Sequence, residues 1–416
     1  MNSRTPFVTF LLLICLIVTS ALGLQALAGP IAAPQTSQAT AKAPVTIPFD
    51  LNGRHILLKG KVNGHPITFV LDTGDQVAIV DLDVAKRMNL SLSGEVRVGG
   101  AGAAISRGAL VNSASFTIDG LEGFSQPVKM ALPIGKVLST RAGRVFEGII
   151  GAEFIQEFVV EIDYLARVLK LHDKEKFAYS GPGESVPIKL VHGHPILEAE
   201  VTPAGSNAPL KGKFVLDIGA SLALALYSPF VAQHRLLGPD AKTIRSLGGA
   251  GAGGETTGRL GRVTELKIGN YTIKSPVTLF SEDKAGAFAS DQLAGNVGAR
   301  VANKFRLFLD YDRKRIIFEP NSNFAAPYDH AHSGMSVVAE GADFRTFRVR
   351  AVLENSPASE AGLQIDDIIT TVNDQPSSEL TLPKLNELFE RPVPYKLTIR
   401  RGEQTLQLTL TPRRLV

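Results

Sequence analysis

The chain has 416 residues, of which 44% are hydrophobic and 20% are charged, and its formal net charge is +4. This length and apolar content predict a folded protein of two or three domains and exclude an intrinsically disordered chain. The lysines and arginines are scattered, without the clusters or interleaved aromatic residues of a nucleic-acid surface, so no nucleic-acid partner is expected.

The N-terminus has the pattern of a secretory signal peptide. An apolar run from Phe7 to Val18 is followed by small residues up to Ala28, and it contains the only cysteine, Cys15. The run of about 12 residues is short for a membrane span of roughly 20; an uncleaved anchor is the alternative. We expect removal of residues 1–28, a flexible tether over 29–46, no transmembrane span in the mature chain, and a periplasmic or secreted location in a bacterial envelope.

The main organising feature is an internal repeat. Phe-Val-Leu-Asp-Thr-Gly ending at Gly74 returns as Phe-Val-Leu-Asp-Ile-Gly ending at Gly219. Three further pairs of segments recur 147 to 149 residues apart, namely 97–103 with 246–252, 148–151 with 295–298, and 158–164 with 305–311. So steady an offset predicts two copies of one domain-sized unit, at 47–180 and 181–320.

Within each copy the sequence favours short strands cut by Gly, Asn and Asp turns. Alternating or β-branched runs predict strands that include 55–62, 67–71, 117–118 and 168–172, and short helices are predicted at 82–88 and 152–156. The polar, Gly- and Pro-containing segments 173–187 and 321–333 are interpreted as joints. Each copy is therefore expected to be mainly β.

A third unit follows at 334–416. Its pattern predicts strands at 347–353, 366–373, 395–400 and 405–410, and helices at 356–363 and 382–389. This order is typical of a small α+β module.

The repeated turns suggest a pair of carboxyl groups. An apolar strand that delivers Asp into a Gly turn buries the carboxyl while leaving backbone N–H groups beside it. If the turns face each other, Asp72 and Asp217 lie too close for both to ionise, and they share one proton. Such a pair can take a proton from water while it gives another to a peptide carbonyl.

Three motifs now point to a known family. Asp72-Thr73-Gly74, the Gly-rich stretch 98–103 and the hydrophobic-Gly element 149–151 resemble retroviral-type aspartic proteases, and two copies in one chain resemble the two-lobed, pepsin-like arrangement over 47–320. The resemblance implies two tandem retropepsin-like β-barrel lobes and an endopeptidase that acts on extended polypeptides, with Asp72 and Asp217 as catalytic residues and no cofactor or metal. It further implies dyad-supporting turns at Thr73, Gly74, Ile218 and Gly219, and flaps containing Gly99, Gly100, Gly102, Gly248, Gly249 and Gly251.

The chain departs from this family pattern at two positions. Asp75 follows the Asp-Thr-Gly motif where Ser or Ala is usual; turned inward it should raise the proton affinity of the dyad, and turned outward it would cap the turn. Ile218 stands where the family has Thr or Ser, whose hydroxyl joins a cross-lobe hydrogen-bond pair. Thr73 is therefore expected to lack its mate.

The third unit carries its own resemblance. Ser356-Pro-Ala-Ser-Glu-Ala-Gly-Leu363 followed by Asp366-Asp-Ile-Ile resembles a bacterial PDZ domain, with Asp366 in the place of the usual glycine. The resemblance implies a module that binds peptide or protein C-termini. Its carboxylate-binding loop would be Gly334, Met335, Ser336 and Val337; the alternative is a purely structural module.

Other motifs receive plainer interpretations. The G-x-G-x-x-G match at 249–254 is in register with the other Gly-rich stretch and is interpreted as a flap. The pairs His192 and His194, and His330 and His332, lack metal-site partners and are interpreted as solvated. Two other functions remain open: a catalytically impaired, peptide-binding protein of the cell envelope, and a structural partner-binding protein.

Overall fold

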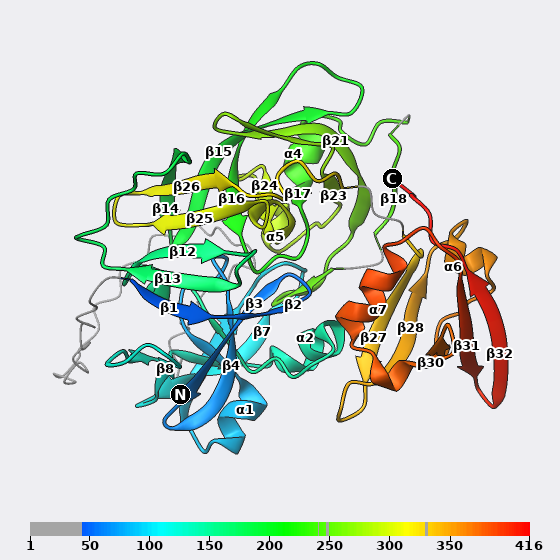
Figure 1. The fold of residues 1–416 in the computed structure, drawn as a ribbon, viewed down its shortest axis with the longest axis horizontal. Coiled ribbons are helices and arrows are strands. Elements are labelled where there is room, and N and C mark those ends of the chain that lie inside the picture. The colour runs from blue at the N-terminus through cyan, green and yellow to red at the C-terminus, as the bar shows by residue number, and fades with distance from the viewer. Residues whose placement is uncertain (1–43, 240, 247–248, 329–331) are drawn as a thin grey trace, which may run out of the picture.

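The computed structural model describes residues 44–239, 241–246, 249–328 and 332–416. The predicted signal peptide with Cys15, most of the tether, Gly248 and His330 lie outside these ranges. Across the described ranges, no helix combines the length and apolarity needed to cross a membrane. Three units follow one another along the chain, and they are coloured blue to cyan, green to yellow and orange to red in Figure 1.

Lobe 1 is built from short strands and three short helices. The strand His55–Val62 alternates buried and exposed residues over its second half, as a strand with one face on a core requires. The elements of lobe 1 are β1 (Val45–Pro48), β2 (Asp50–Asn52), β3 (His55–Val62), β4 (His65–Leu71), β5 (Ile79–Asp81), α1 (Leu82–Arg87), β6 (Ser91–Val98), β7 (Ser106–Asn112), β8 (Ser115–Ile118), β9 (Gln126–Pro127), β10 (Met130–Leu132), α2 (Gly135–Ala142), β11 (Gly148–Ile150), α3 (Ala152–Ile155), β12 (Val159–Asp163) and β13 (Val168–His172).

Lobe 2 has a matching set of elements. They are β14 (Glu184–Val191), β15 (His194–Pro203), β16 (Leu210–Asp217), β17 (Leu224–Leu226), α4 (Ser228–Gln233), β18 (Ile244–Arg245), β19 (Ala250–Gly251), β20 (Gly254–Glu255), β21 (Gly258–Ile268), β22 (Tyr271–Lys274), β23 (Val277–Ser281), η1 (Ala287–Ala289), β24 (Gly295–Gly298), α5 (Ala299–Ala302), β25 (Phe305–Asp310) and β26 (Arg315–Pro320).

The two lobes share one strand topology. In lobe 1 the order is β7-β10-β5-β11-β4-β3, and in lobe 2 it is β21-β23-β17-β24-β16-β15. The directions also agree, since β11 is parallel to β4 as β24 is to β16, and β10 is parallel to β5 as β23 is to β17. Because Asp72 follows β4 and Asp217 ends β16, both carboxyls lie at the same place in equivalent sheets.

A shared antiparallel sheet joins the lobes. Its order is β1-β13-β12-β25-β26-β14, and β12 of lobe 1 pairs with β25 of lobe 2 (Figure 1).

The boundaries predicted from the sequence at this junction were partly wrong. β1 begins at Val45, inside the predicted tether, and β14 begins at Glu184, inside the predicted joint 173–187. One hydrophobic core runs through both lobes, so they pack as one body.

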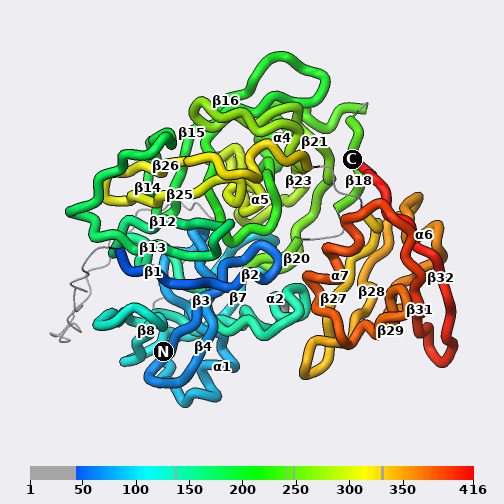
Figure 2. The backbone as a smooth tube through the Cα atoms, viewed as in Figure 1, coloured from blue at the N-terminus to red at the C-terminus, as the bar shows by residue number. Residues whose placement is uncertain are grey.

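The third unit is a six-stranded sheet with its own core. Its elements are β27 (Met335–Glu340), β28 (Thr346–Val352), α6 (Pro357–Glu360), β29 (Ile368–Val372), β30 (Gln375–Pro376), η2 (Ser377–Glu379), α7 (Leu382–Phe389), β31 (Tyr395–Arg401) and β32 (Gln404–Leu410). The sheet order β27-β28-β29-β31-β32 leaves β27 at one edge, and α7 lies beside it (Figure 2).

The described part of the predicted joint that precedes residue 329 packs on lobe 2. The Tyr328 side chain is buried, and its hydroxyl donates a hydrogen bond to the Arg300 carbonyl at 3.1 Å. Arg262 in turn donates to the Tyr328 carbonyl at 2.7 Å. The third unit is therefore held against lobe 2 through its connecting segment.

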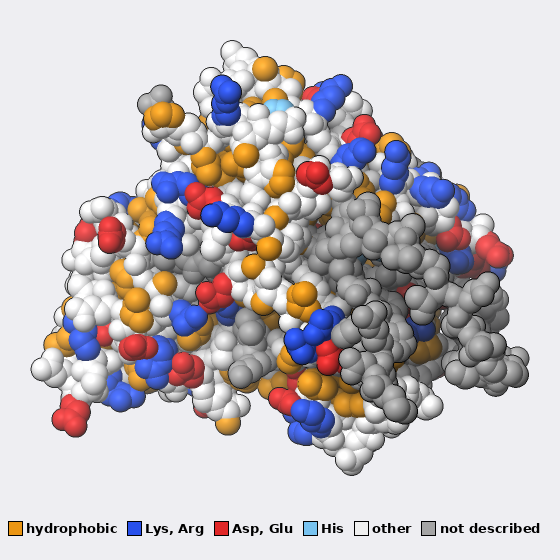
Figure 3. All heavy atoms as spheres, turned by 180° about the vertical axis from the view of Figure 1, so that it is seen from behind, with side chains coloured by type: hydrophobic (Ala, Val, Ile, Leu, Met, Phe, Trp, Pro, Cys, Tyr) orange, Lys and Arg blue, Asp and Glu red, His pale blue; other side chains and the backbone are white. Residues whose placement is uncertain are grey.

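The mainly β class predicted from the sequence is confirmed. On the face drawn in Figure 3, Lys and Arg side chains alternate with Asp and Glu side chains across the coloured surface. That face presents no extended field of one sign, in keeping with the scattered charges of the sequence.

Candidate active site

The two Asp-containing turns meet at the lobe interface. Asp72 receives a hydrogen bond from the Gly74 N–H at 2.7 Å, and Asp217 receives one from the Ala220 N–H at 2.9 Å. A side-chain hydrogen bond links the two carboxyls, and the Gly219 N–H donates to both. The structure thus brings together two carboxyls that are 145 residues apart in the chain.

The pair is buried and holds protons tightly. Asp72 is 4% exposed and Asp217 is 0% exposed. Burial raises the pKa of Asp72 to about 6, although the Gly74 N–H opposes the shift. Burial and the neighbouring Asp72 carboxyl raise the pKa of Asp217 well above its usual range. The pair therefore titrates as a unit and carries one shared proton around neutral pH.

Glycine at 219 is a steric requirement of this arrangement. A Cβ atom placed there would lie 2.0 Å from Asp72 Oδ2 and 2.1 Å from its Cγ. Any side chain would push the carboxyls apart. The predicted turn residues Thr73, Gly74, Ile218 and Gly219 all lie at this interface.

Thr73 makes the cross-lobe contact beneath the dyad. Its hydroxyl donates to the Leu216 carbonyl at 2.6 Å and accepts from the Ile218 N–H at 3.0 Å, and all three residues are buried. The expectation that Thr73 lacks a mate was wrong, because its partners are backbone groups that any residue at 218 would supply. Ile218 instead buries its side chain in the common core.

We predict that Thr73→Val destabilises the fold by about 3 kcal/mol. The valine can neither donate to Leu216 nor accept from Ile218, so two buried backbone groups lose their partner, at roughly 1–3 kcal/mol each. Urea unfolding monitored by circular dichroism measures the change. Thr73→Ser is the control, since it keeps the hydroxyl and loses one methyl, worth about 1 kcal/mol. Equal losses in the two variants would contradict the role of the hydroxyl.

Asn296 is a site residue that the sequence analysis missed. Its amide donates to Asp217 Oδ2 at 2.8 Å, and its own oxygen accepts a short hydrogen bond from the buried Tyr227 hydroxyl. The equivalent position in lobe 1 is Ile149, which cannot make such a bond. The signal was present, because a polar residue interrupts the apolar hydrophobic-Gly element at 295–298.

Two histidines, the half-buried His55 and the buried His194, make hydrogen bonds between the lobes. His55 of β3 hydrogen-bonds to the Gly219 carbonyl at 3.0 Å, and His194 of β15 bonds to the Thr73 backbone. Burial lowers the pKa of His55, and it lowers the pKa of His194 to about 4. The interpretation of His194 as solvated was wrong, whereas His192 is exposed. Each imidazole hydrogen-bonds to the backbone of the Asp turn in the opposite lobe.

Asp75 is turned inward. Its side chain is 0% exposed, and neither carboxyl oxygen has a hydrogen-bond partner among the described residues. Burial is the main cause that raises its pKa well above the usual range, and the charges of Asp72 and Asp217 add to the shift. Asp75 is therefore a neutral acid beside the dyad.

The two Gly-rich hairpins close over the dyad and bond to each other. The Ala104 N–H donates to the Gly253 carbonyl at 2.7 Å, and the Gly253 N–H donates to the Ala101 carbonyl at 2.9 Å. Gly102 has a positive φ of 96°, and a Cβ there would lie 2.3 Å from Gly253 O. Of the predicted flap glycines, all but Gly248 lie in described parts of these hairpins. These hydrogen bonds hold the two hairpins together beside the pocket that Asp72 lines.

A cavity of about 260 Å³ lies beneath the flaps. Asp72 and Gly219 form part of its floor, and its walls are largely apolar, with Phe146, Ile149 and Phe288 among the lining residues. A largely apolar pocket beside a buried acid pair suits an extended chain with hydrophobic side chains.

Comparison with protein families now identifies the parts. Residues 58–154 match the family model described as aspartyl protease, and residues 348–401 match that of the PDZ domain. The first lobe is therefore similar to aspartyl proteases, and the C-terminal unit is similar to PDZ domains. The predicted resemblance and the predicted aspartic protease-like fold with a PDZ domain are confirmed.

Two of the solved structures that are similar to this chain are an aspartic proteinase and a PDZ domain. The aspartic proteinase from Irpex lacteus is 11% identical, covers 68% of this chain and 99% of its own, and has a TM-score of 0.43. The HtrA3 PDZ domain bound to a phage-derived ligand (FGRWV) is 26% identical, covers 19% of this chain and 82% of its own, and has a TM-score of 0.18. No curated protein matches the chain.

The PDZ domain has its predicted binding segment at the start of β27. Gly334 precedes the strand with a φ of 78°, and a Cβ there would lie 2.2 Å from the Cβ of Ser356. Met335, Ser336 and Val337 already belong to β27, with a bulge between the last two. The segment is thus a loop only at Gly334, and it lines a cavity of about 380 Å³.

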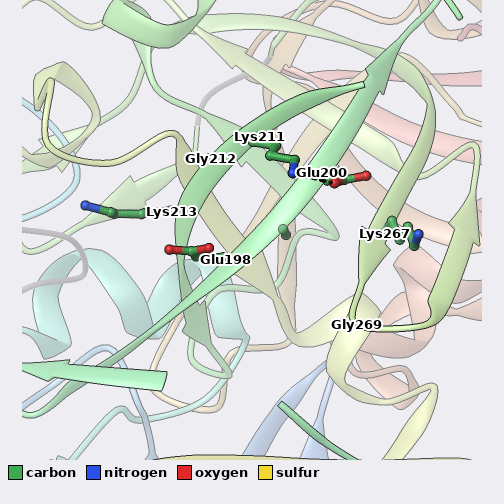
Figure 4. A pocket seen from close by; sticks show the side chains of 8 residues that line it. Glu198, Glu200, Lys211, Gly212, Lys213, Lys267 and Gly269 are labelled. Atoms are coloured by element: carbon green, nitrogen blue, oxygen red, sulfur yellow. Dashed lines mark ion pairs between the residues drawn. The ribbon is translucent and has the colours of Figure 1, made fainter. Parts of the chain in front are cut away.

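A further hollow of about 370 Å³ lies on lobe 2, along β15 and β16, and is drawn in Figure 4. Its labelled side chains carry both signs of charge, and Lys211 forms an ion pair with Glu200 at 3.6 Å. Asp72, Asp75 and Asp217 do not line it.

Proposed function

We propose that this chain is an exported aspartic endopeptidase that cleaves extended polypeptides, with Asp72 and Asp217 as its catalytic pair. The observation that carries the proposal is the buried, hydrogen-bonded carboxyl pair beneath two closed flaps. The family match of the first lobe supports the same activity class.

The reaction follows from one shared proton. The ionised carboxyl takes a proton from a water whose oxygen bonds to the peptide carbonyl carbon, and the protonated carboxyl gives its proton to the carbonyl oxygen. The carbon–nitrogen bond then breaks as the nitrogen takes a proton from the pair, and one hydroxyl of the tetrahedral diol returns its proton to the pair as the carboxylic acid forms. The products are a carboxylic acid and an amine, and the pair again holds one proton.

The test is cleavage of an unfolded polypeptide between pH 3 and 8, followed by mass spectrometry of the fragments. We expect internal cleavage with an acid limb near pH 6, because the pKa of Asp72 is raised to about 6 and the pair must lose one proton to act. Absence of cleavage at every pH, with peptide binding retained, would favour the alternative of a catalytically impaired, peptide-binding protein of the cell envelope.

We also propose that the PDZ domain binds peptide or protein C-termini. The edge strand β27 can accept an added strand, and the segment Gly334–Val337 lines a cavity where a terminal carboxylate would lie. Export rests on the sequence pattern of residues 1–28. An intact mass that begins at Gly29 in the purified exported protein would support it, and a retained Met1 would contradict it.

A further inference from the structure

Helix α2 forms a wall between the catalytic cavity and the PDZ domain. Leu138, Arg141 and Ala142 line the cavity that contains Asp72. Arg141 also lines the second cavity, together with the PDZ segment Gly334–Val337. One residue therefore borders both the proposed catalytic site and the proposed peptide-binding site.

The same helix lies where a PDZ ligand would bind. A peptide joins a PDZ domain as an added strand on the edge strand, next to the neighbouring helix. Here the edge strand is β27 and the helix is α7, and α2 packs against both, as Figures 1 and 2 show. At the end of α2, Gly143 comes so close to Leu382 of α7 that a Cβ would lie 2.7 Å from the leucine Cβ. A peptide strand on β27 would have to move α2.

An ion-pair cluster ties α2 and the PDZ domain to a flap. Glu255 belongs to β20, on the hairpin of lobe 2 that closes over the dyad. Its Oε1 accepts from Arg141 of α2 at 2.9 Å and from Arg350 of β28 at 2.9 Å. The hairpin tip just before it bonds to the other flap through Gly253. A continuous series of contacts therefore connects the PDZ groove, between β27 and α7, with the Gly-rich hairpins beside Asp72.

We propose that Glu255 is a latch through which the PDZ groove controls the flaps. A peptide with a free C-terminal carboxylate binds β27, displaces α2, draws Arg141 away from Glu255 and so favours the open flaps. The empty PDZ groove keeps the site closed. The proposal rests on the proposed function for its effect on cleavage, but the opening of the flaps is a property of the fold and can be measured separately.

The expected change in flap opening follows from the solvent exposure of the Glu255 ion pairs. The Glu255 side chain is 57% exposed, and those of Arg141 and Arg350 are 21% and 55% exposed. An exposed ion pair shifts an equilibrium by up to about fivefold, and the latch has two such pairs. We therefore expect a ligand or a latch mutation to change flap opening by about three- to tenfold.

The experiment uses the full mature chain and a short peptide ending in a free valine carboxylate, with its C-terminally amidated twin. The free peptide should raise kcat/KM for an internally quenched substrate about three- to tenfold, and the amidated twin should not. Glu255→Gln should raise the basal kcat/KM about threefold and remove most of the response to the peptide. Asp374→Asn, which breaks an exposed PDZ ion pair with Lys396, is the control and should behave as wild type.

Hydrogen–deuterium exchange separates the latch from the chemistry. The free peptide and Glu255→Gln should each speed exchange at the flap amides of Ala104 and Gly253, whether or not the protein cleaves anything. Faster exchange without cleavage would support the latch and sink the proposed protease activity. The latch would be overturned if saturating peptide changed neither the cleavage rate nor the exchange of the flap amides. Slower exchange of these amides, or a failure of the peptide to bind, would also overturn it.

Discussion

Replacing either dyad carboxyl by its amide should abolish peptide cleavage. We expect Asp72→Asn and Asp217→Asn each to lower kcat/KM by at least about a thousandfold, because one member must take a proton from water while the other gives one up. An amide can do neither. The assay is cleavage of an unfolded polypeptide at the pH optimum of the wild-type chain.

The fold should survive both changes. The side chains keep their size, and removing a buried carboxyl with a raised pKa also removes a cost of burial at neutral pH. Thermal unfolding checks this. Asp50→Asn, at an exposed position of β2, is the matched control and should cleave as wild type. Cleavage at the wild-type rate by either dyad variant would rule out the pair as the catalytic group.

The two carboxyls have different surroundings, although the turns that carry them are repeats. Asp217 is held by the Asn296 amide, which Tyr227 orients, whereas Asp72 faces the cavity and has a smaller shift in pKa. The repeated backbone brings the carboxyls together, and the unmatched side chains give each a separate role.

The sequence predicted the repeated parts well because their signals are local. The strand at 55–62 and the helix at 382–389 have the predicted bounds, and the helix predicted at 82–88 ends one residue earlier. Alternating apolar residues specify a strand, and a capping residue before apolar residues at helical spacing specifies a helix, so a few neighbouring residues suffice to predict either element. The pairing of the two Asp turns followed from their duplicated frames.

The features that were missed depend on contacts between distant segments. Helix α2 begins at Gly135 after an N-cap residue, Ile134, that makes no side-chain cap, so its sequence carries little helical signal. Its packing on β27 and α7, some 200 residues later, stabilises it instead. Burial of His194 likewise depends on the opposite lobe. Thr73 was expected to lack a partner because Ile218 has no hydroxyl, whereas its partners are the Leu216 carbonyl and the Ile218 N–H.

Asp75→Asn should make the protein more stable at neutral pH than the wild type. In the folded protein burial holds the pKa of Asp75 well above its usual range, while in the unfolded chain it is about 4. Between these two values the unfolded state loses a proton that the folded state keeps. Folding stability therefore falls as pH rises, by up to about 1.4 kcal/mol per pH unit for this group.

Asparagine at 75 does not titrate, so the variant loses that slope. We expect unfolding free energies from urea titrations to be similar at pH 3, where the wild-type carboxyl is protonated in both states, and to favour the variant by at least about 2 kcal/mol at pH 7. Asp72 and Asp217 titrate in both proteins, and because their charges contribute to the pKa of Asp75, the difference reports Asp75 together with its coupling to the dyad. Because a neutral acid is replaced by a neutral amide, cleavage should change only a few-fold. If the unfolding free energies of the two proteins changed in parallel from pH 3 to 7, Asp75 would be ionised in the folded protein. The dyad would then have a third negative charge beside it.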